Sequence, residues 1–112
     1  MILVEKNITR EQLKPLTQNF FSEMVKGVID IQKGVLALDA ELHSDLEKML
    51  LENGSDQSDL WGINLYPYKD GDDFVEFESL INIRPWQGNR SRLIEDETLQ
   101  AKIRLVLKDR II

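Results

Sequence analysis

The stretch Val28–Leu38, which reads VIDIQKGVLAL, decides the fold class of this chain. Its two ends are rich in aliphatic and β-branched residues, and the QKG between them suits a short turn because glycine adopts positive φ without strain. We therefore predict a β-hairpin whose strands are Val28–Ile31 and Val35–Leu38. Strands joined by a short turn are antiparallel, so the hairpin favours a sheet that is mostly antiparallel.

The segments that flank the hairpin show strand and helix patterns in turn. Further strands are predicted where apolar residues run together or alternate with polar ones, at Met1–Val4, Trp61–Tyr66 and Phe74–Arg84. Helices are predicted where apolar residues recur at helical spacing: from Thr9 with a stripe that reaches Met24, from Asp39 to Asn53, and from Asp96 onward. Because hairpins outnumber crossovers in this order, we predict an α+β fold. It has a mostly antiparallel sheet of about five strands and three helices packed mainly on one face.

The same patterns place individual residues. Asp39 is a reasonable N-cap for the second helix, and Gly54 suits its end. Asp30 and Asn64 fall on the faces of their strands that point away from the predicted core, so we expect both side chains to be solvated. Trp61 shares a face with the apolar residues of its strand, which predicts that it is part of the core.

The composition limits the class of protein. With 112 residues and no linker or repeat, the chain is expected to form a single domain over residues 1–112. Its 20 acidic and 14 basic residues give a net charge of -6, which disfavours a nucleic-acid-binding surface. The absence of cysteine excludes disulfides, cysteine nucleophiles and thiolate metal sites. No apolar run approaches the ~18 residues that span a membrane, and the start lacks a signal-peptide pattern, so we expect a soluble, cytoplasmic protein without a cofactor.

The stretch NIRPWQGNRSR, from Asn82 to Arg92, carries three arginines and no acid in a chain that is acidic overall. A glycine-containing loop can turn backbone N–H groups inward around an anion, and arginine adds paired donors for phosphate or carboxylate. The pattern does not match the phosphate-binding GxxxxGK[ST] loop, because the lysine is absent. The alternative is that the arginines pair with the protein's own carboxylates, since residues 39–59 carry seven acids and one lysine. The predicted ligand-binding residues are Arg84, Gln87, Gly88, Asn89, Arg90, Ser91 and Arg92.

His43 is the only histidine, so any imidazole chemistry must use it. It lies on the second predicted helix, with Asp39 and Glu47 one turn to either side, and a neighbouring carboxylate can orient an imidazole as a general acid or base. Glu41 and Asp45 form a second carboxylate pair one face over. His43, Asp45 and Glu41 are therefore the candidate catalytic residues. The alternative is a histidine at the edge of the core in a surface ion pair. No HExxH-type spacing is present, and no metal site is predicted.

Three segments together resemble a known family. They are Ala40-Glu41-Leu42-His43, the LWGINLYP of residues 60–67, and the INIRPWQGNRSR of residues 81–92 followed by IED at 94–96. In these stretches the chain is similar to a small bacterial family, found in cyanobacteria among others, that is known only as a domain of unknown function. The resemblance spans nearly the whole chain and implies one complete domain. It implies no activity, substrate or catalytic residue.

Three functions remain open at this point. The first is binding of a small phosphate- or carboxylate-bearing ligand by the Arg84, Arg90 and Arg92 loop. The second is a hydrolase or phosphoryl-transfer enzyme with His43 as acid or base and the loop stabilising negative charge, which requires helix and loop to be adjacent. The third is a structural or regulatory protein that acts as a homodimer through apolar residues without an internal role: Leu51, Trp86, Ile111 and Ile112.

Overall fold

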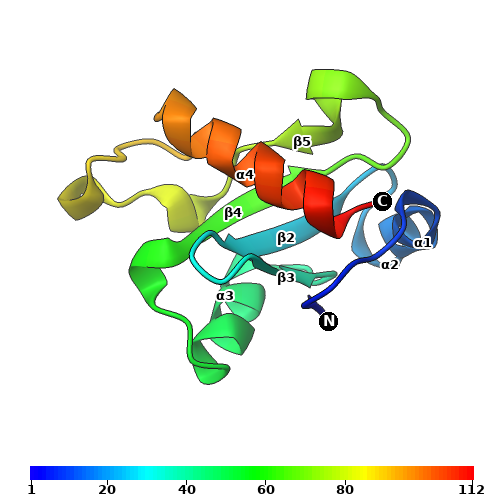
Figure 1. The fold of residues 1–112 in the computed structure, drawn as a ribbon, viewed down its shortest axis with the longest axis horizontal. Helices are drawn as coiled ribbons and strands as arrows, with labels where there is room; N and C mark the ends of the chain where they lie inside the picture. The colour runs from blue at the N-terminus through cyan, green and yellow to red at the C-terminus, as the bar shows by residue number, and fades with distance from the viewer.

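The computed structural model describes residues 1–112 and contains one five-stranded sheet. The strand order is β1-β3-β2-β4-β5, and every neighbouring pair is antiparallel (Figure 1). This confirms the predicted fold class, α+β with a mostly antiparallel sheet. The strands are β1 (Ile2–Val4), β2 (Val25–Asp30), β3 (Val35–Leu38), β4 (Leu60–Leu65) and β5 (Val75–Glu76).

Three helical segments accompany the sheet. The first is continuous but not uniform, because Pro15 lies in a 3₁₀ turn that joins its two short α-helices. Proline lacks an N–H and clashes with the preceding turn of an α-helix, which accounts for the interruption. The helices are α1 (Arg10–Leu13), α2 (Thr17–Phe20), α3 (His43–Glu52) and α4 (Glu97–Arg110). None of them is both long and apolar enough to cross a membrane.

The predicted hairpin is the centre of the sheet. Gly34 has a φ of 69° in the turn, as the sequence predicted. Asp30 is wrongly predicted to be solvated, since its side chain is fully buried beside this turn. One carboxylate oxygen accepts the N–H groups of Gln32 and Lys33, and the other accepts the hydroxyl of Ser55 at 2.6 Å. These bonds satisfy the buried charge and fix the turn, so the carboxylate is structural.

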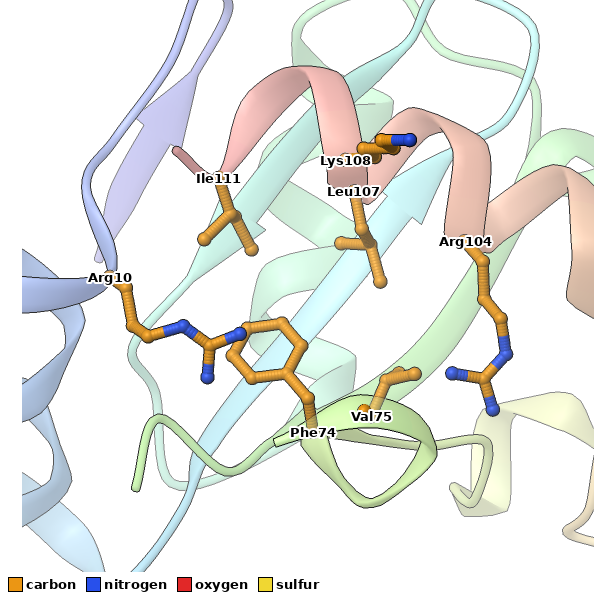
Figure 2. Close-up of a pocket in the computed structure, with 8 residues that line it drawn as sticks. Arg10, Phe74, Val75, Arg104, Leu107, Lys108 and Ile111 are labelled. Atoms are coloured by element: carbon orange, nitrogen blue, oxygen red, sulfur yellow. The ribbon is translucent and has the colours of Figure 1, made fainter. Parts of the chain in front are cut away.

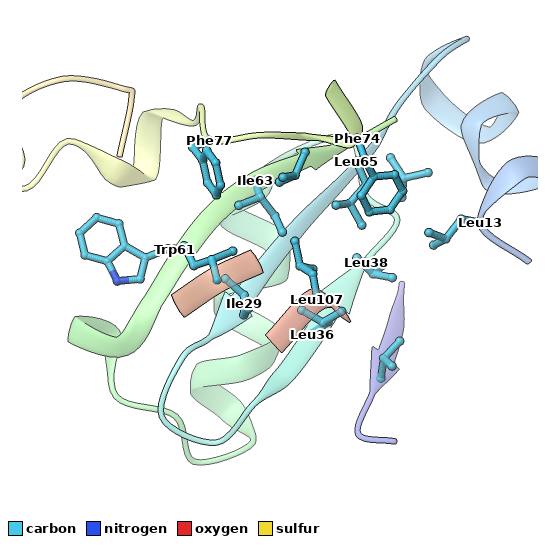
Figure 3. Packing of buried hydrophobic residues seen from close by; sticks show 14 of the residues in the cluster. Leu13, Ile29, Leu36, Leu38, Trp61, Ile63, Leu65, Phe74, Phe77 and Leu107 are labelled. Atoms are coloured by element: carbon cyan, nitrogen blue, oxygen red, sulfur yellow. The ribbon is translucent and has the colours of Figure 1, made fainter. Parts of the chain in front are cut away.

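The helices cover both faces of the sheet, and two of the three helical segments contribute to the larger core (Figure 1). The larger core joins α4, through Ile103 and Leu107, to the face that carries Ile29 and Ile63 (Figure 3). The smaller core joins α3 to the opposite face, and its fully buried members are Val28, Ala37, Leu46, Leu50 and Leu60. β4, which was expected to bury one face only, has all six of its residues buried. Trp61 is in the larger core, as predicted.

Several element boundaries differ from prediction. The first strand of the hairpin begins at Val25 and not at Val28, and the first helical segment ends at Phe20, before Met24. Asp39 does not cap the second helix: it adopts a φ of 75° in the preceding loop, and α3 begins at His43 after Leu42, which makes no side-chain cap bond. The predicted strand over Phe74–Arg84 is also too long, because β5 contains only Val75 and Glu76. After β5 the chain makes one isolated antiparallel bridge, Glu78 with Leu93, and then folds into 3₁₀ turns at Leu80–Asn82 and Pro85–Gln87. These turns change which side chains face inward, so Asn82 and Arg84 are buried while Ile83 is exposed.

Candidate functional site

The Arg84–Asn89 segment closes on itself by backbone hydrogen bonds. The N–H of Arg84 donates to the carbonyl of Asn89 at 2.7 Å, and the N–H of Asn89 donates back to Arg84 at 3.1 Å. The N–H groups of Gln87 and Gly88 donate to the carbonyls of Arg84 and Pro85. Gly88 supplies the positive φ of 82° that this turn requires. The loop is tight, as predicted, but these four N–H groups already have acceptors within it.

The side chains of this loop also bond mainly inward. Asn89 is buried, and its amide donates to the carbonyls of Asn82, Ser91 and Leu93 while its oxygen accepts the N–H of Glu95. The Gln87 amide donates to the carbonyl of Ser58, and the Ser91 hydroxyl donates to the carbonyl of Leu93.

Arg84 is the largest of the fully buried side chains, with 1% of its surface exposed. Its guanidinium donates to the Glu47 carboxylate at 3.2 Å and to the carbonyls of Gln57 and Ile81 at 2.7 and 3.0 Å. It also lies over the Trp61 ring, 4.8 Å from the ring centre. Burial lowers the pKa of Arg84, and the Glu47 carboxylate opposes this. Arg84 therefore pairs with one of the protein's own carboxylates, which was the alternative to ligand binding that the sequence left open.

The structure therefore separates the three arginines of the loop. Arg84 points into the protein, while Arg90 and Arg92 are exposed. Only Arg92 lines a cleft, and that cleft also contains His43. An acid–base role of His43 requires the second helix to lie beside the loop. Arg92 meets this requirement, because it lines the same cleft as His43.

This cleft, called the His43 cleft below, has a volume of about 440 Å³ and lies on the face of the sheet that α3 covers. It is bordered by the start of α3, by β4 and β5, and by the turn that follows β5. Most of the side chains that give it chemical character were not singled out by sequence reasoning. The polar and charged ones are Lys26, His43, Ser44, Asn64, Tyr66, Glu76, Glu78, Ser79 and Arg92.

His43 is buried at the first position of α3, and its Nε2 lies 2.9 Å from the carbonyl oxygen of Ile63. A carbonyl only accepts, so this contact places the proton of the neutral imidazole on Nε2. Burial lowers the pKa of His43 from its ordinary value of 6.5, and the positive charges of Lys26 and Arg92 add to this shift, while the Ile63 carbonyl and the Asn64 side chain oppose it. The imidazole is therefore neutral at pH 7.

Asn64 is the second group of interest. Its amide donates to the Glu76 carboxylate at 2.7 Å and to the carbonyl of Glu78 at 3.1 Å. Its Oδ1 is buried and has no hydrogen-bond partner. The prediction that Asn64 is solvated was wrong because β4 is covered on both faces. Tyr66 completes this side of the cleft: its hydroxyl donates to Glu76 at 3.2 Å, and burial, followed by the Glu76 charge, raises its pKa.

The other predicted catalytic residues lie apart from this cleft. Asp45 lines a separate cavity with Lys48 and Glu52, and Glu41 is exposed and lines none. No group of three or more histidine, aspartate or glutamate side chains is placed to hold a metal ion. Sequence reasoning missed Asn64, whose only signal was its position as a polar residue within the apolar LWGIN stretch.

The four apolar residues suggested for a homodimer do not form one group. Ile111 packs against the larger core, so it has an internal role after all. Leu51, Trp86 and Ile112 are exposed, Trp86 by 73%, and they come from α3, the Arg84–Asn89 loop and the C-terminus.

The fold and the cleft together define a small α+β domain with one half-enclosed polar cleft beside its only histidine. A family model matches residues 2–110 of the chain. The chain belongs to that family, which is described as Protein of unknown function (DUF5674). No curated protein and no solved structure matches the chain.

Proposed function

We propose that the His43 cleft binds a small ligand that carries an anionic group, a phosphate or a carboxylate, and at least one hydrogen-bond donor. The observation that carries this proposal is that His43, Arg92 and Asn64 line the same cleft, and that Oδ1 of Asn64 has no hydrogen-bond partner. Because Oδ1 is buried, a ligand hydroxyl or amino group reaches it only when the neighbouring side chains move; the new bond then recovers the cost of about 1–3 kcal/mol of a buried acceptor without a donor.

The charges in the cleft favour one orientation of such a ligand. Burial is the main cause of the lowered pKa of His43, and the charges of Lys26 and Arg92 add to it, so both cations lie near enough to attract an anionic group in the cleft. Glu76 is already held by the Asn64 amide and the Tyr66 hydroxyl, and it repels an anion from its own end of the cleft. The ligand's anionic group thus lies toward Arg92 and its donor toward Asn64.

Binding of an anion should raise the pKa of His43, because it offsets the two positive charges that lower it. The single imidazole can be titrated by NMR with sodium chloride at matched ionic strength as the reference. The probes are inorganic phosphate, glycerol 3-phosphate and lactate. We expect an upward shift with at least one of the two hydroxyl-bearing anions.

The variant pair for this test is Arg92→Ala and Arg90→Ala. Both remove an exposed arginine of the same loop, but only Arg92 lines the cleft. Arg92→Ala should raise the pKa of His43 in the free protein and abolish the ligand-induced shift, whereas Arg90→Ala should change neither. Equal behaviour of the two variants, or no shift beyond the sodium chloride reference with any probe, rejects the proposal.

A second candidate function, acid–base catalysis of hydrolysis or phosphoryl transfer, is favoured by the state of His43. A neutral imidazole with one nitrogen fixed by the Ile63 carbonyl is a competent base at neutral pH. Turnover of p-nitrophenyl phosphate and p-nitrophenyl acetate would be measured for the wild type and for His43→Gln, which keeps a donor for the Ile63 carbonyl. Catalysis by His43 predicts a loss of about 100-fold or more in the variant. Equal rates, or none above buffer, leave binding as the function.

A further inference from the structure

A second hollow, of about 290 Å³, lies on the opposite face of β5 from the His43 cleft. Val75 borders it, while the next residue, Glu76, borders the His43 cleft, as the alternation of side chains along a strand requires. Figure 2 shows the hollow between α4 and the segment that carries Phe74. Its floor is apolar and consists of Phe74, Val75, Leu107 and Ile111.

Three cationic side chains surround this floor, and no acidic residue lines the hollow, although the chain has 20 acids against 14 bases. Arg10 comes from α1, while Arg104 and Lys108 come from one face of α4. In Figure 2 the guanidinium groups of Arg10 and Arg104 stand on two sides of the apolar floor. The tertiary structure thus brings together cations that are more than 90 positions apart in the sequence.

The two arginines are held in place by contacts other than carboxylates. Arg10 donates to the carbonyl of Lys69 at 2.8 Å, and its guanidinium lies 4.1 Å from the centre of the Phe74 ring. The guanidinium of Arg104 lies 5.0 Å from the centre of the Phe77 ring. Both groups are preorganised, because stacking on an aromatic ring restricts a long side chain while leaving N–H donors available.

The two carboxylates nearest to these arginines form only weak ion pairs with them. Asp70 lies 4.0 Å from Arg10 and Asp72 lies 3.8 Å from Arg104, and both carboxylates are fully exposed to water. Exposed pairs at this separation contribute little, so a ligand carboxylate that reaches the arginines can replace them.

We propose that this hollow binds a small amphipathic carboxylate, in which an aromatic ring or short alkyl chain lies on the apolar floor and the carboxylate meets Arg104 and Lys108. At roughly 30 Å³ per water-sized group, the volume accepts about ten non-hydrogen atoms, which is the size of phenylacetate or octanoate. This site is independent of the His43 cleft, whose ligand needs a hydrogen-bond donor and not an apolar body.

The test measures binding of phenylacetate by chemical-shift changes in the NMR spectrum, with acetate and benzyl alcohol as probes that lack the ring or the charge. We expect saturable shifts around Phe74, Leu107 and Ile111 with phenylacetate, and much weaker binding of either partial probe. If acetate binds as tightly as phenylacetate, or benzyl alcohol does, the proposed combination of charge and apolar floor is wrong.

Variants inside and outside the hollow test whether its own cations bind the carboxylate. The double substitution of Arg104 and Lys108 by alanine should weaken phenylacetate binding at least about tenfold, because charged hydrogen bonds are lost. Lys102→Ala removes an exposed cation of the same helix that lines no cavity, and should leave binding unchanged. Arg92→Ala should also leave it unchanged, since Arg92 belongs to the His43 cleft. Unaltered binding in the double variant, with the fold confirmed by its spectrum, overturns the proposal.

Discussion

Two buried asparagines, Asn64 within β4 and Asn82 beside Gly62 of the same strand, differ in how completely they are hydrogen-bonded. The oxygen of Asn82 accepts the N–H of Gly62 at 2.8 Å, and its amide donates to the carbonyls of Gly62 and Arg92. Asn64 donates through its amide as well, but its Oδ1 has no partner. Asn82 belongs to the NIRPWQGN stretch, and Asn64 belongs to the His43 cleft.

The comparison shows that polarity in a sequence does not distinguish a binding loop from a structural one. β5 ends before it can pair with Gly62, and the Asn82 side chain takes the place of the missing strand. Gly62 has no side chain because an added Cβ would lie 2.4 Å from that of Ser79. A polar residue whose bonds are all made within the protein is structural, whereas Asn64 keeps an acceptor that the protein does not use.

The largest effect that tests this comparison is expected for Arg84→Ala. The substitution removes the buried guanidinium that donates to the Glu47 carboxylate and to the carbonyls of Gln57 and Ile81, and leaves these three acceptors without that donor. We expect a loss of about 3–5 kcal/mol in the free energy of unfolding, measured by urea denaturation. Arg90→Ala, on the same loop but exposed, should change it by less than about 0.5 kcal/mol. Similar costs for both variants would mean that the buried arginine does not hold the loop.

Asn82→Ala should rank second, at about 2–3 kcal/mol, because it leaves the N–H and the carbonyl of Gly62 unpaired inside the protein. The same urea measurement applies. Asn7→Ala is the matched control, since that asparagine is exposed. A cost near zero for Asn82→Ala would show that the end of β4 does not depend on the side-chain bridge.

Asn64→Ala should cost about 1 kcal/mol, clearly less than Asn82→Ala. It removes donors to Glu76 and to the carbonyl of Glu78, but it also removes a buried oxygen that has no partner. Comparing the two alanine variants by urea denaturation measures the difference between the two asparagines directly. Equal costs would contradict the idea that the cleft residue is incompletely satisfied.

The last prediction concerns the dependence of stability on the charge of His43. Its folded pKa is below 6.5, so between these two values the unfolded chain binds a proton that the folded chain does not. The stability that the neutral imidazole provides is present above pH 6.5 and is lost as the pH falls toward the folded pKa. Relative to His43→Gln, the wild type should therefore lose at most about 1.4 kcal/mol per pH unit across this window. A difference between the two proteins that stays constant from pH 8 to 5 would contradict the lowered pKa.

The sequence predicted the hairpin, the order of strands and helices, and several of the residues that end or begin them. Thr9, from which the first helix was predicted, forms a capping box with Gln12, and Asp96 caps α4 by accepting the N–H groups of Thr98 and Leu99. These features depend on residues within a few positions of one another, so local propensity is enough to place them. His43 was also singled out as a candidate acid or base, because it is the only residue that could supply an imidazole.

The tertiary structure alone decided which polar residues face a cleft. Arg84 and Arg92 are eight positions apart in one basic stretch, yet one is buried against Glu47 and the other borders His43. Nothing local separates them, since the difference comes from Glu47 and Gln57, which fold back onto the loop from far along the chain. The same holds for Asn64, whose burial depends on α3 covering a second face of the sheet. Local sequence determined where the chain turns, and long-range packing determined which donors and acceptors the protein itself satisfies.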